Sequence, residues 1–281
     1  MGPLSQLHNE GTMGWTQSCV PARARLARAE LSSATPSVNE DGVHVLAFDR
    51  PSTRPQCVSA NDCAEALSKF CASVSWLPLA QSNAEVPHYW GAVRGAFSPS
   101  PYETFWLASR VMMNQLQRLA SGKAFDVVHF DTIGLAQYRS AVPSIPAVLN
   151  FHDIDSTKFY RRAEAESNPL LRIYWRNQAK KFLALERLEC PRMALNLVVS
   201  EEERQILGSS VSENKIVLVP NGTDTEHFQP RRDPGGHTLL FCGTMDLFPN
   251  HDAMEYFCAN IWPDLTRMNK QIRMFVVGRN P

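Results

Sequence analysis

The stretch Asn196-Leu197-Val198-Val199-Ser200-Glu201-Glu202-Glu203 decides the fold. Its apolar run predicts a strand, and Ser200 followed three residues later by Glu203 has the pattern of a capping box, which begins a helix. A strand therefore leads directly into a helix. The same alternation recurs along the chain, and several of its strands are apolar throughout, as strands buried on both faces are. The predicted strands cover residues 43–48, 74–79, 126–130, 147–151, 196–199, 216–220, 238–242 and 273–277.

The helix signals between these strands indicate a parallel sheet. Asn168 followed by Pro169 has the pattern of a capped helix start, and Pro191 ends the long helix that follows. One face of this helix carries apolar side chains, namely Leu171, Trp175, Phe182 and Leu185. Strands that alternate with helices imply right-handed crossovers, so the fold class is α/β with a mostly parallel sheet.

The length of 281 residues allows one large α/β domain or two modest ones. We expect residues 1–41 to be poorly ordered apart from a short helix around Ala22–Ala34. Residues 42–228 then form a first domain. The polar, Pro- and Gly-rich run 229–237 suits an interdomain linker, and residues 238–281 begin a second domain.

Composition and charge exclude several classes of protein. The formal net charge is zero and no tail carries a long run of like charge, so nucleic acid is not an expected partner. Neither a secretory signal nor an apolar run of about 20 residues is found, and no strongly basic amphipathic helix is recognised, which predicts a soluble cytoplasmic protein. Seven cysteines without a C-x-x-C pair argue against disulfides and thiolate zinc sites, so we expect them to be reduced and mostly packed.

Polar residues follow the predicted strands where ligands bind to open parallel sheets. One strand delivers His129 and Asp131, the next delivers His152, Asp153 and Asp155, and a third delivers Ser200 at a helix start that suits an anionic phosphate. A structural, hydrogen-bonded role is the alternative for both histidines, and capping alone is the alternative for Ser200. A His/Asp metal site is a further alternative, but the spacing matches no strong ligand motif.

Two glycine-containing stretches also follow strands. In Val219-Pro220-Asn221-Gly222-Thr223-Asp224 the chain is expected to turn sharply, with Gly222 supplying a positive φ. In Phe241-Cys242-Gly243-Thr244-Met245-Asp246 the glycine allows the phosphates of a ligand to approach the backbone. Both stretches also have a purely structural interpretation as turns.

As an ordered series these motifs resemble the retaining glycosyltransferases of family 4, which have the GT-B architecture of two facing Rossmann-like domains. The resemblance covers residues 43–281 and looks most like the bacterial exopolysaccharide branch, which acts in polysaccharide biosynthesis. It is carried by Phe125-Asp126-Val127-Val128-His129, His152-Asp153-Ile154-Asp155-Ser156, Val199-Ser200-Glu201, residues 219–228, residues 241–246, Pro249-Asn250 and Asp252-Ala253.

The resemblance implies an N-terminal acceptor-side domain and the start of a domain that binds a nucleoside-diphosphate sugar. His152 would be catalytic, donating a hydrogen bond to the leaving diphosphate. No metal or other cofactor is expected. The acceptor would be a glycan or a lipid-linked glycan, which is compatible with peripheral contact at the inner membrane face. Substrate-binding candidates are His129, Asp131, Asp153, Asp155, Ser200, Asn221 and Gly222, and donor-binding candidates are Gly243, Thr244, Asn250 and Arg279.

Two features depart from the family pattern. Residues 1–41 show neither the first strand nor the Gly-rich loop, and the family's paired glutamates and basic phosphate ligands are not found after Gly278. We therefore expect a truncated enzyme that binds its donor weakly, with a region after His237 that is unstable or prone to association. The alternatives are a non-catalytic fragment or pseudoenzyme, and a sugar-nucleotide epimerase.

Overall fold

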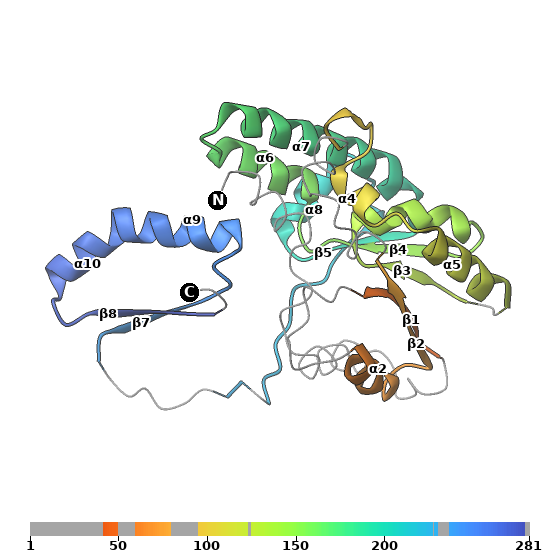
Figure 1. Ribbon diagram of the computed structural model, residues 1–281, viewed down its shortest axis with the longest axis horizontal. Helices are drawn as coiled ribbons and strands as arrows, with labels where there is room; N and C mark the ends of the chain where they lie inside the picture. The colour runs from red at the N-terminus through yellow and green to blue at the C-terminus, as the bar shows by residue number, and fades with distance from the viewer. Residues whose placement is uncertain are drawn as a thin grey trace. The chain divides into compact units, whose positions relative to one another are not determined.

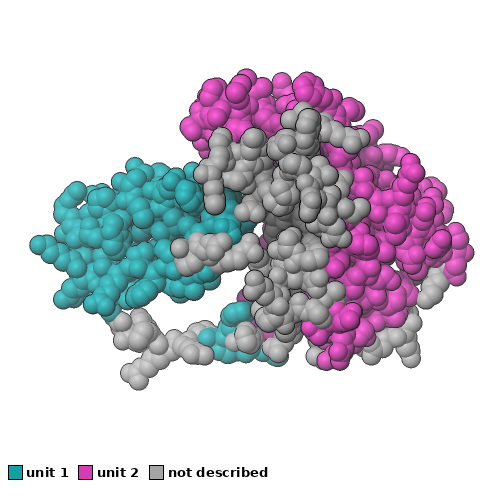
Figure 2. Space-filling view, in the orientation of Figure 1, with its two compact units in different colours: residues 1–13, 225–281 teal, residues 14–224 magenta. Residues whose placement is uncertain are grey.

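The computed structural model describes residues 42–49, 60–79, 95–122, 125–226, 228–229 and 236–278. The predicted short helix near the N-terminus, the centre of the predicted linker, and Arg279 lie outside these residues. The chain divides into two compact units, residues 14–224 and residues 1–13 with 225–281 (Figure 2). Each unit is described by itself, as unit 2 and unit 1 respectively.

Unit 2 contains two parallel sheets (Figure 1). In the first, β1 (His44–Asp49) pairs with β2 (Ser73–Pro78), and α2 (Ala60–Ser68) precedes β2. The second has the order β3-β4-β5-β6, with bounds Val128–Phe130, Ala147–Asn150, Leu195–Val198 and Ile216–Leu218. The four strand pairings of this unit follow the α/β class that the sequence predicts, because every pair is parallel.

The strands match the predicted runs, but the hydrogen-bonded sheet is divided. We expected one sheet in the first domain, whereas no ladder joins β1 to β3 among the described strands; the edge-on contact of the His44 and Phe125 rings, with centroids 5.4 Å apart, connects the two regions. Strand β3 is also shorter than predicted, since Val127 is exposed and pairing begins at Val128. The continuous apolar runs therefore predicted where the strands lie, but not where the hydrogen-bonded pairing between strands begins and ends.

Helices cover the four-stranded sheet and supply much of the core. Their bounds are α4 Tyr102–Trp106, α5 Arg110–Gly122, α6 Asp155–Ala165, α7 Pro169–Glu189 and α8 Glu201–Gly208. Short 3₁₀ turns occupy Ile133–Ala141, Cys190–Arg192 and Glu213–Lys215. The ring of Phe159 on α6 stacks on Trp175 and Phe182 of α7, at centroid distances of 5.6 and 4.9 Å, so aromatic packing holds these two helices together.

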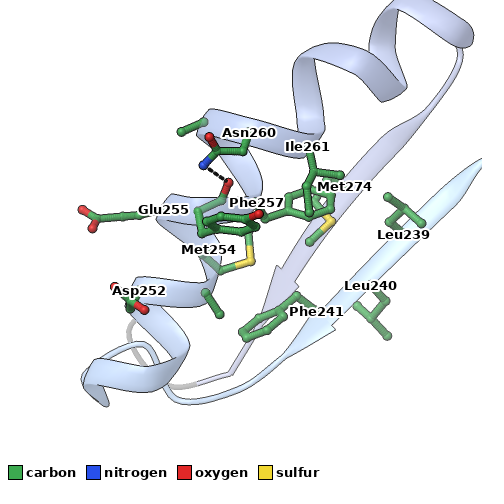
Figure 3. A pocket seen from close by; sticks show the side chains of 13 residues that line it. Leu239, Leu240, Phe241, Asp252, Met254, Glu255, Phe257, Asn260, Ile261 and Met274 are labelled. Atoms are coloured by element: carbon green, nitrogen blue, oxygen red, sulfur yellow. Dashed lines mark hydrogen bonds between the residues drawn. The ribbon is translucent and has the colours of Figure 1, made fainter. Parts of the chain in front are cut away.

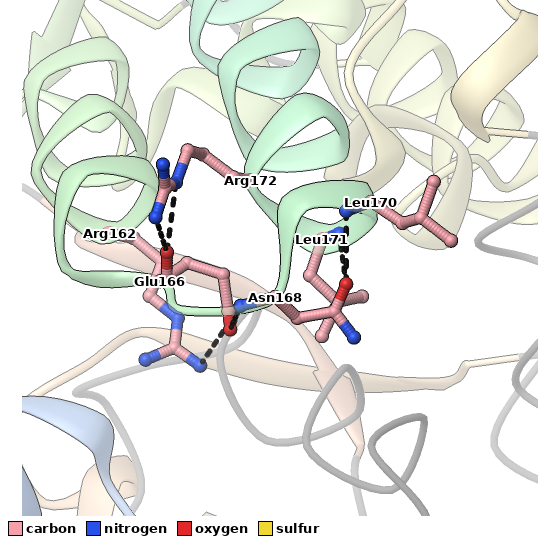
Figure 4. Close-up of polar contacts among 6 residues, drawn as sticks. All are labelled: Arg162, Glu166, Asn168, Leu170, Leu171 and Arg172. Carbon is pink, nitrogen blue, oxygen red and sulfur yellow. Dashed lines mark hydrogen bonds and ion pairs between the residues drawn. The ribbon is translucent and has the colours of Figure 1, made fainter.

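The α6–α7 connection has the predicted cap (Figure 4). The Asn168 side-chain oxygen accepts from the backbone N–H groups of Leu170 and Leu171, at 2.9 and 3.4 Å. The Arg172 guanidinium donates twice to the carbonyl oxygen of Glu166, at 2.9 and 2.7 Å, which fixes the loop from the other side. Trp175 and Phe182 on the predicted apolar face are buried, and the helix ends at Glu189, just before Pro191.

In unit 1, β7 (Thr238–Cys242) and β8 (Arg273–Val277) form a parallel pair. A bent helix connects them, consisting of α9 (Phe248–Tyr256), a π-helical turn (Phe257–Ile261) and α10 (Trp262–Met268). This helix covers one face of the pair (Figure 1). The alternate positions Leu240, Phe275 and Val277 are 67, 51 and 51 % exposed, so the other face is apolar and open.

Two remaining expectations concern the whole chain. None of the described helices is long and apolar enough to cross a bilayer. The cysteines are less uniformly packed than predicted: Cys63 and Cys190 are buried, whereas Cys242 and Cys258 are exposed on the outer parts of unit 1. Cys19 and Cys57 lie outside the described residues.

Candidate functional site

The carboxyl end of β4 carries the centre of the candidate site. The last strand residue is Asn150, and His152 follows two residues later. The Asn150 Nδ2 atom lies 2.8 Å from His152 Nε2, and Asp131, which follows β3, has its Oδ1 atom 3.4 Å from both of these nitrogens. The structure thus brings together His152 and Asp131, two of the predicted residues, through an asparagine that the sequence analysis did not single out.

Two polar groups face the same nitrogen of the imidazole. An Nε2 atom without a proton can accept from the Asn150 amino group at 2.8 Å, whereas an Nε2 atom with a proton can donate to Asp131 Oδ1 at 3.4 Å. Asp131 also accepts from the Asn150 amino group at 3.4 Å. Asp131 is therefore placed to pair with the ring when the ring is protonated.

A capping box at the carboxyl end of β5 lies beside this histidine loop. The Glu203 N–H donates to Ser200 Oγ at 3.2 Å, as predicted. The Glu203 carboxylate reaches back to accept from the Val199 N–H at 3.1 Å, one residue before the N-cap. Burial raises the pKa of Glu203, and the nearby Asp153 carboxylate raises it further, while N–H groups including that of Ile154 lower it. Glu203 therefore links the start of α8 to the loop that contains His152.

Replacement of Ser200 by alanine is expected to lower the free energy of unfolding by about 1 kcal/mol, because the Glu203 N–H loses its acceptor. Urea denaturation measures the change. Ser200→Asp supplies another capping oxygen and should recover most of the loss. The matched control is Ser209→Ala at the other end of α8, where the hydroxyl donates to the Ile206 carbonyl and caps no N–H group. Equal losses at the two serines would contradict the capping role.

Asp155 and its neighbours form a buried charged cluster under the site. The Asp155 carboxylate is buried and ion-paired with Lys158, one turn further along α6. Glu186, from the last turn of α7, accepts from the Ser156 N–H at 2.9 Å and from the Ser156 hydroxyl at 2.5 Å. Because Ile154 at the N-cap position of α6 has no capping side chain, Glu186 caps the start of α6 from another helix.

Burial is the main reason why the pKa of Glu186 is raised, to about 7. The two hydrogen bonds from Ser156 oppose this increase, the Asp155 carboxylate adds to it, and Lys158 opposes it. Asp153 also has a raised pKa, first because of burial and then because of Asp155, against the opposing effect of Lys158. Asp153 and Asp155 follow β4 directly, and Glu186 reaches the same segment from α7. The segment after His152 therefore depends on buried polar contacts.

The remaining predicted residues of unit 2 lie on β3 or just beyond β6. His129 is exposed on β3, and Asn221 and Gly222 are exposed beyond the end of β6. The sharp turn predicted at Gly222 is wrong, since this glycine does not have a positive φ and the chain turns at Thr225 and Glu226 instead. Proline at position 220 restricts the preceding residue to extended backbone, which favours continuation of the chain past β6.

In unit 1, Gly243 and Thr244 lie in the loop after β7, and Asn250 lies in the first turn of α9. The Asn250 side-chain amide donates to the Thr244 carbonyl at 2.9 Å, and a Cβ atom at Gly243 would lie 3.0 Å from the same amide nitrogen. Gly278, after β8, has a φ of +149°, and a Cβ there would lie 2.0 Å from the Gly243 carbonyl oxygen. Internal packing is therefore sufficient to require glycine at position 278, and it leaves little room for a side chain at position 243.

A cavity of about 880 Å³ in unit 1 is separate from this loop (Figure 3). It lies between the connecting helix and the strand pair, and its lining is largely apolar, with Phe241, Met254, Phe257, Ile261 and Met274 among the side chains drawn. None of the predicted donor-binding residues lines it. The cavity is an incompletely filled part of the layer between helix and sheet. Among the described residues, no group of three or more histidine, cysteine, aspartate or glutamate side chains is arranged to hold a metal ion.

The ordered series of motifs corresponds to a known family. A family profile described as Glycosyltransferase Family 4 matches residues 58–227, which is 170 of the 281 residues. The chain belongs to glycosyltransferase family 4. No curated protein matches it.

The matched range contains every candidate residue of unit 2, from His129 to Gly222. As a family 4 glycosyltransferase, the protein acts on a sugar donor and an acceptor. Sequence analysis identified Glu203 in its capping box but missed Asn150 and Glu186 as supports of the site. A polar residue within the buried run Ala147–Asn150 was the available signal for Asn150, whereas the role of Glu186 depends on a contact across 30 residues that has no local pattern.

Proposed function

We propose that this family 4 glycosyltransferase moves a sugar from a nucleoside-diphosphate sugar to a glycan or lipid-linked acceptor with retention of configuration, and that His152 is its catalytic residue. The observation that carries the proposal is the position of His152 at the carboxyl end of β4, with Nε2 held by Asn150 and Asp131 nearby. Carboxyl ends of parallel strands are the usual ligand-binding edge of such sheets.

The chemistry required of His152 is modest. As the bond between the sugar and the diphosphate breaks, negative charge grows on the leaving oxygen, and the Nδ1–H group would donate a hydrogen bond to it. In this tautomer Nε2 would accept from the Asn150 amino group, and Asp131 would stabilise the ring if it gains a second proton. N–H groups at the start of α8, which Ser200 and Glu203 order, would add further positive potential. The proposal needs no metal.

The other predicted residues keep supporting roles in this proposal. His129, Asp131, Asp153, Ser200, Asn221 and Gly222 would contact the acceptor or the transferred sugar. Gly243, Thr244, Asn250 and Arg279 would contact the donor. Asp155 is buried against Lys158, so we assign it to the ordering of α6 rather than to substrate. A bacterial exopolysaccharide pathway on the cytoplasmic side of the membrane is the proposed setting.

Replacement of His152 by alanine is expected to lower kcat by about 100-fold, because one donor to the developing charge is lost. The assay follows release of nucleoside diphosphate from labelled UDP- and GDP-hexoses with a glycan acceptor. His237→Ala is the matched control, because His237 is an exposed histidine at the amino end of β7, away from the carboxyl edge. Activity should persist in EDTA.

Three outcomes would contradict the proposal. Full activity of the His152→Ala variant would remove His152 from the mechanism. If the native chain shows no donor binding and no turnover, the non-catalytic alternative is indicated. An altered nucleotide sugar that forms without acceptor would identify an epimerase.

A further inference from the structure

The outward face of α7 combines cationic and apolar side chains. This 21-residue helix is about 30 Å long, and it lies at the periphery of unit 2 (Figure 1). At its first turn Leu170 is 75 % exposed and points away from the polar contacts of the α6–α7 loop (Figure 4). Its exposed residues are Pro169, Leu170, Ile173, Arg176, Lys180, Leu183, Ala184, Arg187 and Leu188.

The buried and the exposed side of α7 carry different charges. Both acidic residues of the helix, Glu186 and Glu189, are buried. Two of the five cations are engaged inside the unit, since Arg172 donates to the Glu166 carbonyl and Lys181 donates to the carbonyl oxygens of Gly95 and Ala96. The exposed face therefore carries positive charge from the other three cations and no negative charge. Those cations are Arg176, Lys180 and Arg187.

These cations and the exposed aliphatic residues form one stripe. At about 100° per residue the exposed positions fall within an arc of about 140°, with the three cations near its centre and leucines at both margins. Sequence alone hid this arrangement, because Glu186 and Glu189 offset the cations when the helix is considered as a whole. The sequence analysis, which recognised no strongly basic amphipathic helix, did not separate the exposed face of α7 from its buried one.

We propose that this face of α7 binds the surface of a bilayer that contains anionic lipids. Lysine and arginine side chains can reach anionic headgroups, while Leu170, Ile173, Leu183 and Leu188 enter the boundary between headgroups and acyl chains. The stripe has no exposed aromatic side chain, whereas protein interfaces are enriched in aromatic anchors. A planar anionic surface fits it better than a protein partner does. On the adjacent α6, Glu164 is the exposed acidic residue.

This inference goes beyond glycosyl transfer and does not depend on it, because vesicle binding is measured without donor or acceptor. The full chain is sedimented with phosphatidylcholine vesicles that either contain phosphatidylglycerol or lack it. We expect binding to the anionic vesicles alone, and we expect it to weaken as NaCl is raised. The Arg176→Glu/Lys180→Glu variant should bind at least about 10-fold less tightly, and Leu170→Asn/Ile173→Asn should also bind less.

The matched control is Arg110→Glu/Arg118→Glu, which makes the same charge change at two exposed arginines of α5. Far-UV circular dichroism confirms that each variant is folded. Unchanged binding by Arg176→Glu/Lys180→Glu would overturn the proposal, because the membrane contact would then lie elsewhere. An equal loss in the α5 control would also overturn it, because binding would then depend only on the net charge of the protein. No binding to either vesicle would also overturn it and would favour a protein as the partner of this face.

Discussion

Replacement of Glu186 by leucine is expected to lower the free energy of unfolding of unit 2 by about 3 kcal/mol near pH 5.5. The Ser156 N–H and hydroxyl both lose their acceptor, and a buried donor without a partner costs about 1–3 kcal/mol. Urea denaturation followed by tryptophan fluorescence reports the change, because Trp175 is buried where α6 meets α7. Glu164→Leu is the matched control, since Glu164 is exposed on α6 and should change stability by less than about 0.5 kcal/mol.

Glu186 should also make stability depend on pH. Its pKa is raised from the ordinary value of 4.5 to about 7, so the folded state holds a proton that the unfolded state releases. This contribution is fully present below pH 4.5 and is lost as the pH rises through about 7. The shift corresponds to about 3 kcal/mol.

Glu186→Gln isolates this effect, because glutamine keeps an acceptor for Ser156 and cannot ionise. The neighbouring titratable groups Asp153, Asp155, Lys158 and Glu189 are common to both proteins, so their effects largely cancel in the difference. The stability of the native chain relative to Glu186→Gln should therefore fall between pH 4.5 and 7. A difference that stays constant over this range would show that Glu186 is ionised throughout, and an equal loss in Glu164→Leu would contradict the cap.

Replacement of Gly278 by alanine should disrupt the pairing of β7 with β8, at a cost above about 3 kcal/mol. The new methyl group would lie 2.0 Å from the Gly243 carbonyl oxygen, and a φ of +149° is one that L-residues rarely adopt. Because the Gly243 atoms that the methyl group would meet belong to the backbone, no side-chain rotation relieves the clash. Hydrogen exchange measured by mass spectrometry should show faster exchange in residues 238–242, 243 and 273–277, including the Gly243 N–H, which donates to the Val277 carbonyl at 2.9 Å.

The control for this variant is Gly208→Ala at the end of α8. No atom lies within 4 Å of the position that its Cβ would occupy, so the substitution should be neutral or slightly stabilising. Exchange in unit 2 should remain unchanged in the Gly278→Ala variant. Native protection of β7 and β8 after the Gly278 substitution would mean that the close approach of the two glycines is relaxed easily.

The sequence predicted the fold class and the eight strands because these depend on local patterns. Runs such as Ala147–Leu149 are apolar over their whole length, and Asn168 and Ser200 cap helices through contacts two or three residues away. The division of the first sheet was not predictable in this way, because pairing of β1 with a later strand depends on long-range geometry. Strand ends were approximate for the same reason.

The candidate site was predictable in part. His152 and Asp131 were identified because parallel strands place their carboxyl ends together, and the structure brings the two side chains within 3.4 Å. The contact of His152 with Asn150 was not predicted, and the conformation of the following loop depends on Glu186 and Glu203, which approach from other elements. Residue type alone also gave Gly243 a ligand-binding interpretation, where the structure provides a packing reason.

The parallel arrangement of β7 and β8 has a consequence for the order of folding. A parallel pair cannot form through a tight hairpin, so the 30 residues from 243 to 272 must first bring the two strands together. Closing a loop of that length costs about 3 kcal/mol of chain entropy. We expect the connecting helix to form early in folding. The pairing of β7 with β8 should form later, in a single kinetic step that requires the helix to be present.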